Sequence, residues 1–128
     1  MDLQLPIIGQ PISAVILEFT ATIRIGSPDE FELQIESELN LHTASGDALH
    51  AAAGDYSGIG SELESLVGCK VTKANASEVN GLNMEFDSGA AIHVPVDKDY
   101  EAWGIVGRSG YRVISTPGGE FAIWSARK

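Results

Sequence analysis

The stretch GQPISAVIL, Gly9 to Leu17, sets the architecture, because the stretch GCKVTKANA, Gly68 to Ala76, repeats its outline. In each stretch a glycine opens a strand-like run. The matched positions are Ile12 with Val71, Ala14 with Lys73, and Ile16 with Asn75. Self-similarity of this kind marks a structural unit that occurs more than once. The sequence therefore predicts a duplicated architecture, which by itself says little about chemistry.

The match extends to the runs that follow each stretch, with a turn between successive runs. We therefore expect one domain, residues 1–128, made of two similar halves at about 5–57 and 68–124, each a β-meander. The matched runs are Thr22–Ile25 with Asn83–Phe86, Phe31–Ile35 with Ala91–Pro95, and a last pair that turns at Ser45–Asp47 and at Arg108–Gly110.

Alternation of apolar and polar residues with period two predicts half-buried antiparallel strands. The clearest example is residues 30–36, where Phe31, Leu33 and Ile35 face one way and the polar residues face the other. Pro95 cannot donate to a ladder, so its strand is expected to lie at a sheet edge or to end its pairing there. Turns are predicted at residues 26–29 and 116–119, the second of type II.

One segment, residues 61–67, has helical features. Ser61 and Glu64 have the spacing of a capping box, and Gly68 is suited to end the helix. Its apolar stripe consists of Leu63, Leu66 and Val67. The predicted fold class is therefore all-β: a duplicated β-meander that forms a small antiparallel β-sandwich or a partly open barrel, with one short connecting helix.

Charge is distributed unevenly between the halves. The chain carries 18 acidic and 8 basic residues, for a formal net charge of −10. Residues 1–59 contain nine acids and one base, a net charge of −8, whereas residues 60–128 contain nine acids and seven bases, a net charge of −2. Such acidity argues against nucleic-acid partners and anionic membranes, and it favours a cationic partner. Solubility alone explains the acidity equally well.

The histidines and carboxylates do not form a recognisable catalytic or metal-binding motif. His42 and His50 flank a turn; a three-residue loop places them opposite each other, and a two-residue loop places them on opposite faces. Even a facing pair is half a zinc site, with no cysteine close in sequence. Residues 97–101 lack the glycine and the distal glutamate of a calcium loop. We therefore expect no catalytic residue, no cofactor and no metal ion.

The candidate functional residues form two groups suited to protein binding. The first is an acidic face on and after the strand at residues 31–35. It consists of Glu30, Glu32, Glu36 and Glu38. The second joins an acidic loop to two aromatic side chains, and it consists of Asp99, Tyr100 and Trp103. Aromatic anchors beside carboxylates are common at protein interfaces. His93 is expected to point to solvent.

The last third of the chain carries a distinctive pattern: Asp97-x-Asp99-Tyr100-Glu101-Ala102-Trp103, Gly107, Gly110, Pro117-Gly118-Gly119 and Ala122-Ile123-Trp124. Together with Leu5–Gly9 and Ile35-Glu36-Ser37, this pattern resembles a family of small uncharacterised proteins from actinobacteria. The resemblance covers most of the chain apart from residues 56–67. It implies an actinobacterial cytoplasmic protein and supplies no reaction. Small acidic proteins of this kind are often suspected to be immunity proteins, which neutralise a toxin by binding it.

Three hypotheses of function follow. The leading one is a non-enzymatic acidic protein-binding module, of the immunity type, that neutralises a basic toxin. One alternative is a small-ligand-binding protein or hydrolase that uses the interior between the sheets, near Trp103 and Trp124. Another is a self-associating structural protein, a homodimer that pairs through an edge strand. A single cysteine, no recognisable leader and no long apolar run predict a cytoplasmic location.

Overall fold

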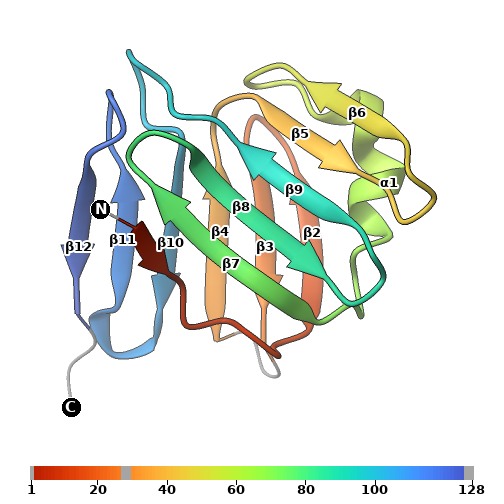
Figure 1. Cartoon of the computed structure of the whole chain (residues 1–128), viewed down its shortest axis with the longest axis horizontal. Coiled ribbons are helices and arrows are strands. Elements are labelled where there is room, and N and C mark those ends of the chain that lie inside the picture. The colour runs from red at the N-terminus through yellow and green to blue at the C-terminus, as the bar shows by residue number, and fades with distance from the viewer. Residues whose placement is uncertain (1, 27–29, 126–128) are drawn as a thin grey trace.

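The computed structural model of the protein describes residues 2–26 and 30–125. Its strands form two antiparallel six-stranded sheets that stack as a β-sandwich (Figure 1). The all-β prediction is confirmed. Of the two predicted arrangements the sandwich is the one that forms, because neither sheet closes into a barrel.

Each sheet combines strands from both halves of the chain. Sheet I has the spatial order β1 (Asp2–Gln4), β7 (Val71–Ser77), β8 (Gly81–Phe86), β9 (Ala91–Val94), β5 (Leu39–His42) and β6 (Ala48–Ala51). Sheet II has the spatial order β12 (Phe121–Trp124), β11 (Arg112–Ser115), β10 (Trp103–Gly107), β4 (Phe31–Ile35), β3 (Ala21–Ile25) and β2 (Ile12–Leu17).

The two halves of the chain exchange hairpins between the sheets. The meander β2-β3-β4 lies in sheet II, and the hairpin β5-β6 that follows it crosses to sheet I beside β9. The meander β7-β8-β9 lies in sheet I, and the hairpin β10-β11 crosses to sheet II beside β4. Replacing β2–β6 by β7–β11 therefore converts the order of one sheet into the order of the other.

The halves also meet through reciprocal backbone contacts. The Ile12 N–H donates to the Cys69 carbonyl at 2.8 Å, and the Val71 N–H donates to the Gln10 carbonyl at 3.0 Å. A register shift follows at the matching place in β2 and in β7. A β-bulge of this kind bends and twists its strand. The segments Gly9–Leu17 and Gly68–Ala76, which the sequence matched to each other, thus have equivalent backbone pairing in the structure.

One of the predicted matches is wrong by one residue. Gln34 pairs with Thr22 in sheet II, and His93 pairs with Asn83 in sheet I. With Thr22 matched to Asn83, Gln34 corresponds to His93, whereas the sequence comparison matched it to Val94. A shift of one residue exchanges the two faces of a strand. The corrected match places Leu33 with Ile92, and both side chains are buried.

The inner faces of the two sheets supply the core. Ile23 and Leu33 of sheet II and Met84 and Ile92 of sheet I are each at most 2% exposed. Trp103 is 1% exposed, and its ring centroid lies 6.1 Å from that of Phe121. The alternating pattern therefore predicted the inward side chains of these strands correctly.

The connecting helix forms within the predicted region, but its start and its end both differ, because residues 65–68 form turns after the helix and Gly68 does not end it. A 3₁₀ turn, η1 (Ser57–Ile59), leads into α1 (Gly60–Glu64). Ile59 is the N-cap residue and no side chain caps the helix, so the predicted capping box is wrong. Leu63 and Leu66 are buried and anchor the segment, which contacts β2. In the other half β1 pairs with β7, so β1 and α1 flank related strands (Figure 1). The sequence did not reveal β1.

One strand prediction and one turn prediction have clear outcomes. The strand before Pro95, β9, lies inside sheet I and ends at Val94, which is the second of the two predicted alternatives. The predicted turn at residues 116–119 is confirmed, because the Gly119 N–H donates to the Thr116 carbonyl at 2.9 Å and Gly118 has a φ of 88°. The turn predicted at residues 26–29 falls largely outside the described residues.

Candidate functional site

Polar side chains form a continuous row across the outer face of sheet I, one on each strand. The pairing register places each residue of this row opposite the next. The polar row consists of Gln4, Asn75, Asn83, His93, Asn40 and His50. Paired residues share a face of the sheet. The adjacent residues Leu41 and Ile92 are buried, so the polar row faces away from the core.

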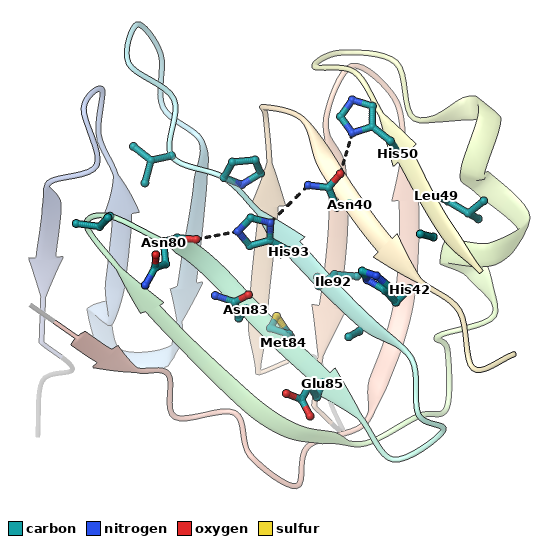
Figure 2. A pocket seen from close by; sticks show the side chains of 15 residues that line it. Asn40, His42, Leu49, His50, Asn80, Asn83, Met84, Glu85, Ile92 and His93 are labelled. Carbon is teal, nitrogen blue, oxygen red and sulfur yellow. Dashed lines mark hydrogen bonds between the residues drawn. The ribbon is translucent and has the colours of Figure 1, made fainter. Parts of the chain in front are cut away.

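Hydrogen bonds connect half of the polar row to the turn between β7 and β8 (Figure 2). His50 Nδ1 lies 2.9 Å from Asn40 Oδ1, and Asn40 Nδ2 lies 3.5 Å from His93 Nδ1. His93 Nε2 lies 2.8 Å from the backbone oxygen of Asn80. His93 therefore has partners on both ring nitrogens, although it lies on the outer face as predicted.

The Asn80 carbonyl sets the direction of these bonds, because a carbonyl only accepts. His93 Nε2 must carry the proton, and a neutral ring then offers Nδ1 as an acceptor to the Asn40 amide. The oxygen of that amide accepts from His50 Nδ1–H. In each of the three hydrogen bonds the donor thus lies on the side of His50 and the acceptor on the side of Asn80. His50 Nε2 is left beside Glu38, 3.6 Å from Oε2.

The outer face of sheet I is hollowed over β8, β9 and β5. The hollow has a volume of about 920 Å³. Apolar side chains form part of its wall, among them Val79, Pro95 and Val96. Val79 is 84% exposed at the tip of the β7–β8 turn. The hollow is thus an open groove with a polar floor and a partly apolar rim.

The structure corrects the predicted geometry of His42 and His50. The loop between β5 and β6 covers residues 43–47, so His42 pairs with Ala48 and His50 pairs with Asn40. The two rings share the outer face, but they are diagonal and do not form a directly opposed pair. In residues 2–26 and 30–125, no group of three His, Cys, Asp or Glu side chains has a geometry that holds a metal ion.

A second surface lies at one end of the sandwich. Ile35 pairs with Trp103, so the residues after β4 meet the residues before β10. The N–H groups of Glu36 and Ser37 both donate to the Ala102 carbonyl, at 2.9 and 3.2 Å. A cavity of about 400 Å³ is lined jointly by residues 37–38 and 95–99. Glu38, Asp97 and Asp99 line this cavity, whereas Glu36 and Glu101 line a second cavity that extends onto the outer face of sheet II. We call the carboxylates of these two segments the acidic end: Glu36, Glu38, Asp97, Asp99 and Glu101.

Local hydrogen bonds shape the loop of the acidic end. Asp97 Oδ1 accepts from the N–H of Asp99 at 2.9 Å and from the N–H of Tyr100 at 3.1 Å. Tyr100 is left 73% exposed. Burial raises the pKa of Glu36, and the carboxyl of Glu101, which shares a hydrogen bond with it, raises the pKa further. The acidic end thus holds two carboxyl groups in mutual repulsion beside an exposed aromatic ring.

Tyr56 fixes the other side of the same region. Its buried hydroxyl donates to the backbone carbonyls of Ile35 and Ser37, at 3.1 and 2.7 Å. Burial raises the pKa of Tyr56, and the nearby Glu36 carboxylate adds to the increase, although a backbone hydrogen bond from Gly54 opposes it. The crossover at residues 36–38 is therefore rigidly held.

The predicted acidic face does not form one surface. Glu32 lies on the outer face of sheet II, 3.6 Å from Arg24, and shares a shallow cavity with Glu30 and Arg108. Glu36 lies beyond the end of β4 but lines a cavity on this outer face together with Glu32 and Glu101, whereas Glu38 lines the cavity at the end of the sandwich with Asp99. The structure thus keeps Glu30, Glu32 and Glu36 along the outer face of sheet II, and it sets Glu38 apart from them, beside a member of the second predicted group.

Trp103 is corrected from a surface anchor to a core residue. Its side chain is 1% exposed, whereas Trp124 is 50% exposed on the outer face of sheet II, where Arg112 lies 5.4 Å from its ring. The two tryptophans, which one alternative hypothesis placed beside a shared ligand, therefore lie on opposite faces of a sheet. The Trp103 Nε1 atom is buried without a hydrogen-bond partner among the described residues.

Sequence reasoning did not identify the polar row. Its members were visible as outward positions in the alternating pattern, for example His93 between Ile92 and Val94. However, Asn40 and His93 are 53 residues apart, and only the pairing of β5 with β9 places them side by side. A register derived from the duplication would have been needed to find the row.

The fold and these surfaces define the class of this protein: a small two-sheet β-sandwich with an open polar groove on one face and an acidic end. The comparison with protein families identifies it further. Residues 3–125 match the family of unknown function DUF6188, and the chain belongs to this family. Searches of curated proteins and of solved structures found no match. The described part of the chain has no helix long and apolar enough to cross a membrane.

Proposed function

We propose that the protein is a non-enzymatic binding module that recognises a basic protein through its acidic end. The observation that carries the proposal is the pairing of β4 with β10, which brings Glu36 of the first half beside Glu101 of the second, next to the loop that carries the exposed Tyr100. Lys98 is the basic residue within this loop, so the acidic end keeps a large negative charge. Negative potential of this kind speeds the association of a cationic partner.

The Glu36–Glu101 pair supports recognition of a positive side chain. Burial raises the pKa of Glu36, and repulsion from the neighbouring Glu101 carboxyl raises it further, because the two groups repel each other when both are ionised. An arginine or lysine placed between them relieves this repulsion and gains charge-assisted hydrogen bonds. Tyr100 offers an aromatic surface with little rotamer entropy to lose, and such residues dominate binding energy at interfaces.

The finer form of the proposal is an immunity-type protein of actinobacterial origin that binds and neutralises a basic toxin in the cytoplasm. The overall charge of −10 suits such a partner. The single free Cys69 suits a reducing compartment, where disulfides are rare.

The test begins with capture of basic proteins from a host lysate on immobilised protein, followed by elution in a salt gradient. The identified partner is then measured by surface plasmon resonance against Glu36→Gln/Asp99→Asn/Glu101→Gln. The control variant Glu18→Gln/Glu62→Gln/Glu64→Gln removes the same charge elsewhere. We expect the first variant to associate at least about tenfold more slowly at low salt and to show a flatter salt dependence.

Three outcomes decide the proposal. Loss of association in the acidic-end variant alone supports it. An equal loss of association in both variants means that binding depends on total charge and that the acidic end is not the binding surface. A lysate that yields no basic partner contradicts the proposal directly.

A further inference from the structure

The polar row is not a requirement of the fold, because sheet II contains the related row with different chemistry. The strand order and register match Asn75, Asn83, His93, Asn40 and His50 to positions on β2, β3, β4, β10 and β11. Those positions hold Ile16, Thr22, Gln34, Gly104 and Ile114. The same architecture is thus built on the other sheet with a single amide, Gln34, and no imidazole. Their presence on sheet I calls for a reason other than folding.

The polar row has hydrogen-bonding capacity left over. Asn75 and Asn83 are half-buried, and their amides make no hydrogen bond to the described residues. Figure 2 shows Asn83 beside His93 on the floor of the groove, with no dashed line to it. By contrast Asn40, His50 and His93 are oriented by their own bonds, so their remaining donors and acceptors have fixed directions. The groove therefore offers a partly preorganised set of neutral polar groups.

We propose that this groove on sheet I binds a neutral, hydroxyl-rich ligand, namely a carbohydrate chain. Amide and imidazole side chains both donate and accept, and sugar hydroxyls do the same. The groove does not favour an anion, because the described residues that line it include the Glu85 carboxylate and no lysine or arginine, and the whole chain carries a charge of −10. Val79 and Val96 on the rim supply apolar contact for the C–H faces of sugar rings.

The spacing of the polar row favours a carbohydrate over an extended peptide. Neighbouring strands lie about 4.8 Å apart, so a ligand that follows the row meets a polar side chain at that interval. One edge of an extended peptide repeats its N–H and C=O groups only every two residues, about 6.7 Å. The two periods drift apart within a few strands. Hydroxyl groups are distributed around each sugar ring. A carbohydrate chain therefore does not present its hydrogen-bonding groups at one fixed spacing that would have to equal the spacing of the strands.

The proposal is independent of the acidic end, which faces a different partner. The two surfaces adjoin, because His50, Pro95 and Val96 line both the groove and the cavity of residues 37–38 and 95–99. However, Asn40 and Asn83 line only the groove, and Glu36 and Glu101 line neither of these two hollows. A variant of the polar row is therefore expected to keep any binding of a basic protein, and a variant at Glu36 or Glu101 is expected to keep carbohydrate binding.

A glycan array with neutral and charged members, followed by native gels that contain a soluble glucan, mannan or galactan, tests the proposal. We expect the protein to bind neutral glycans and to be retarded by at least one of these polysaccharides. Asn40→Ala/Asn83→Ala should bind at least about tenfold more weakly. The control variant Gln34→Ala/Ile114→Ala changes the related row of sheet II and should bind as the unchanged protein does. Circular dichroism and urea unfolding establish that each variant folds.

An NMR titration with the retarding polysaccharide locates the site without a mutation. Shifts of the Asn40 and Asn83 side-chain amides support the proposal. No binding to any neutral glycan overturns it, as does equal loss in the two variants. Binding confined to sulfated or sialylated glycans overturns the neutral chemistry. Amide shifts produced by an extended peptide panel, with no response to glycans, assign the groove to a peptide and also overturn the proposal.

Discussion

The inner and outer faces of the two sheets differ in how closely they match each other. The inner row Ala74, Met84, Ile92, Leu41 and Leu49 of sheet I corresponds to Val15, Ile23, Leu33, Ile105 and Val113 of sheet II. Every member is apolar. The outer rows are less alike, because Asn75, Asn40 and His50 of sheet I correspond to Ile16, Gly104 and Ile114 of sheet II. Packing against the opposite sheet therefore constrains both inner faces in the same way, and the outer faces are free to acquire separate functions.

The largest expected effect comes from a turn that differs between the halves. Gly81 has a φ of 78°, and a Cβ atom there would lie 2.1 Å from the Val94 carbonyl oxygen. Register relates Gly81 to Thr20, which carries a side chain. We expect Gly81→Ala to lower the free energy of unfolding by about 3 kcal/mol or more, through strain and the clash with β9. Thr20→Ala should cost less than about 1 kcal/mol. Urea unfolding measures both, and equal costs would show that the two turns are alike.

A smaller effect is expected where the crossovers between sheets differ. The short crossover at residues 36–38 is held by the buried Tyr56 hydroxyl, whereas the longer one at residues 95–102 is held by Asp97. Tyr56→Phe leaves two buried carbonyls without their donor, so we expect a loss of about 1.5 kcal/mol in unfolding free energy. Tyr111→Phe removes a half-buried hydroxyl and should change stability by less than about 0.5 kcal/mol. A Tyr56 variant as stable as the Tyr111 variant would rule out this role.

The polar row should contribute modestly to stability and strongly to side-chain order. Asn40→Ala removes the link between His50 and His93, at a cost of about 1 kcal/mol because water replaces the amide. Nitrogen NMR of the imidazoles should show His93 protonated at Nε2 in both proteins, and His50 protonated at Nδ1 only while Asn40 is present. Gln34→Ala in sheet II is the matched control. A His93 ring protonated at Nδ1 would mean that the bond direction inferred from Asn80 is wrong.

These residues also show what sequence could and could not predict. The inward residues and the strand runs follow from alternation and from the match of Ile12 with Val71, because both are local or repeated signals. The strand order, in which each half passes a hairpin to the other sheet, was not predicted. The register of residues 31–35 against 91–95 was wrong by one, since local similarity cannot fix which face a strand presents. β1 was missed because three residues carry too little pattern.

The candidate sites were predicted unequally for a related reason. Tyr100 and Asp99 were found because they are neighbours in sequence, and Trp103 was misplaced because its exposure depends on the inner face of β10. The polar row went unnoticed because its residues come from six strands, and a short window contains at most two or three members, such as Asn40 with His50 or Asn75 with Asn83 and His93. A surface site on a sheet consists of residues from several strands, whereas a sequence pattern reports only the residues along one strand.

The smallest expected effect concerns Glu36, whose related position in the other half is Pro95. The folded state raises the pKa of Glu36, so folding binds its proton more tightly than the unfolded chain does. This contribution to stability is complete below the unfolded pKa and is lost as the pH rises through the folded value. At neutral pH the ionised Glu36 therefore opposes folding, which Glu36→Gln relieves by about 0.5 kcal/mol or less, since the group is exposed and screened.

The pH dependence of the stability of Glu36→Gln distinguishes a functional role of the Glu36–Glu101 pair from a structural one. The gain from Glu36→Gln should be present near pH 7 and vanish near about pH 4, where the carboxyl is protonated in both states. Glu64→Gln on α1 is the control and should show no such pH-dependent gain. Urea unfolding across this range measures both variants. A gain at neutral pH means that the chain retains a carboxylate that weakens its own fold, as functional sites often do. A loss at neutral pH instead makes the Glu36–Glu101 pair structural, and it removes the main support for the acidic end as a binding surface.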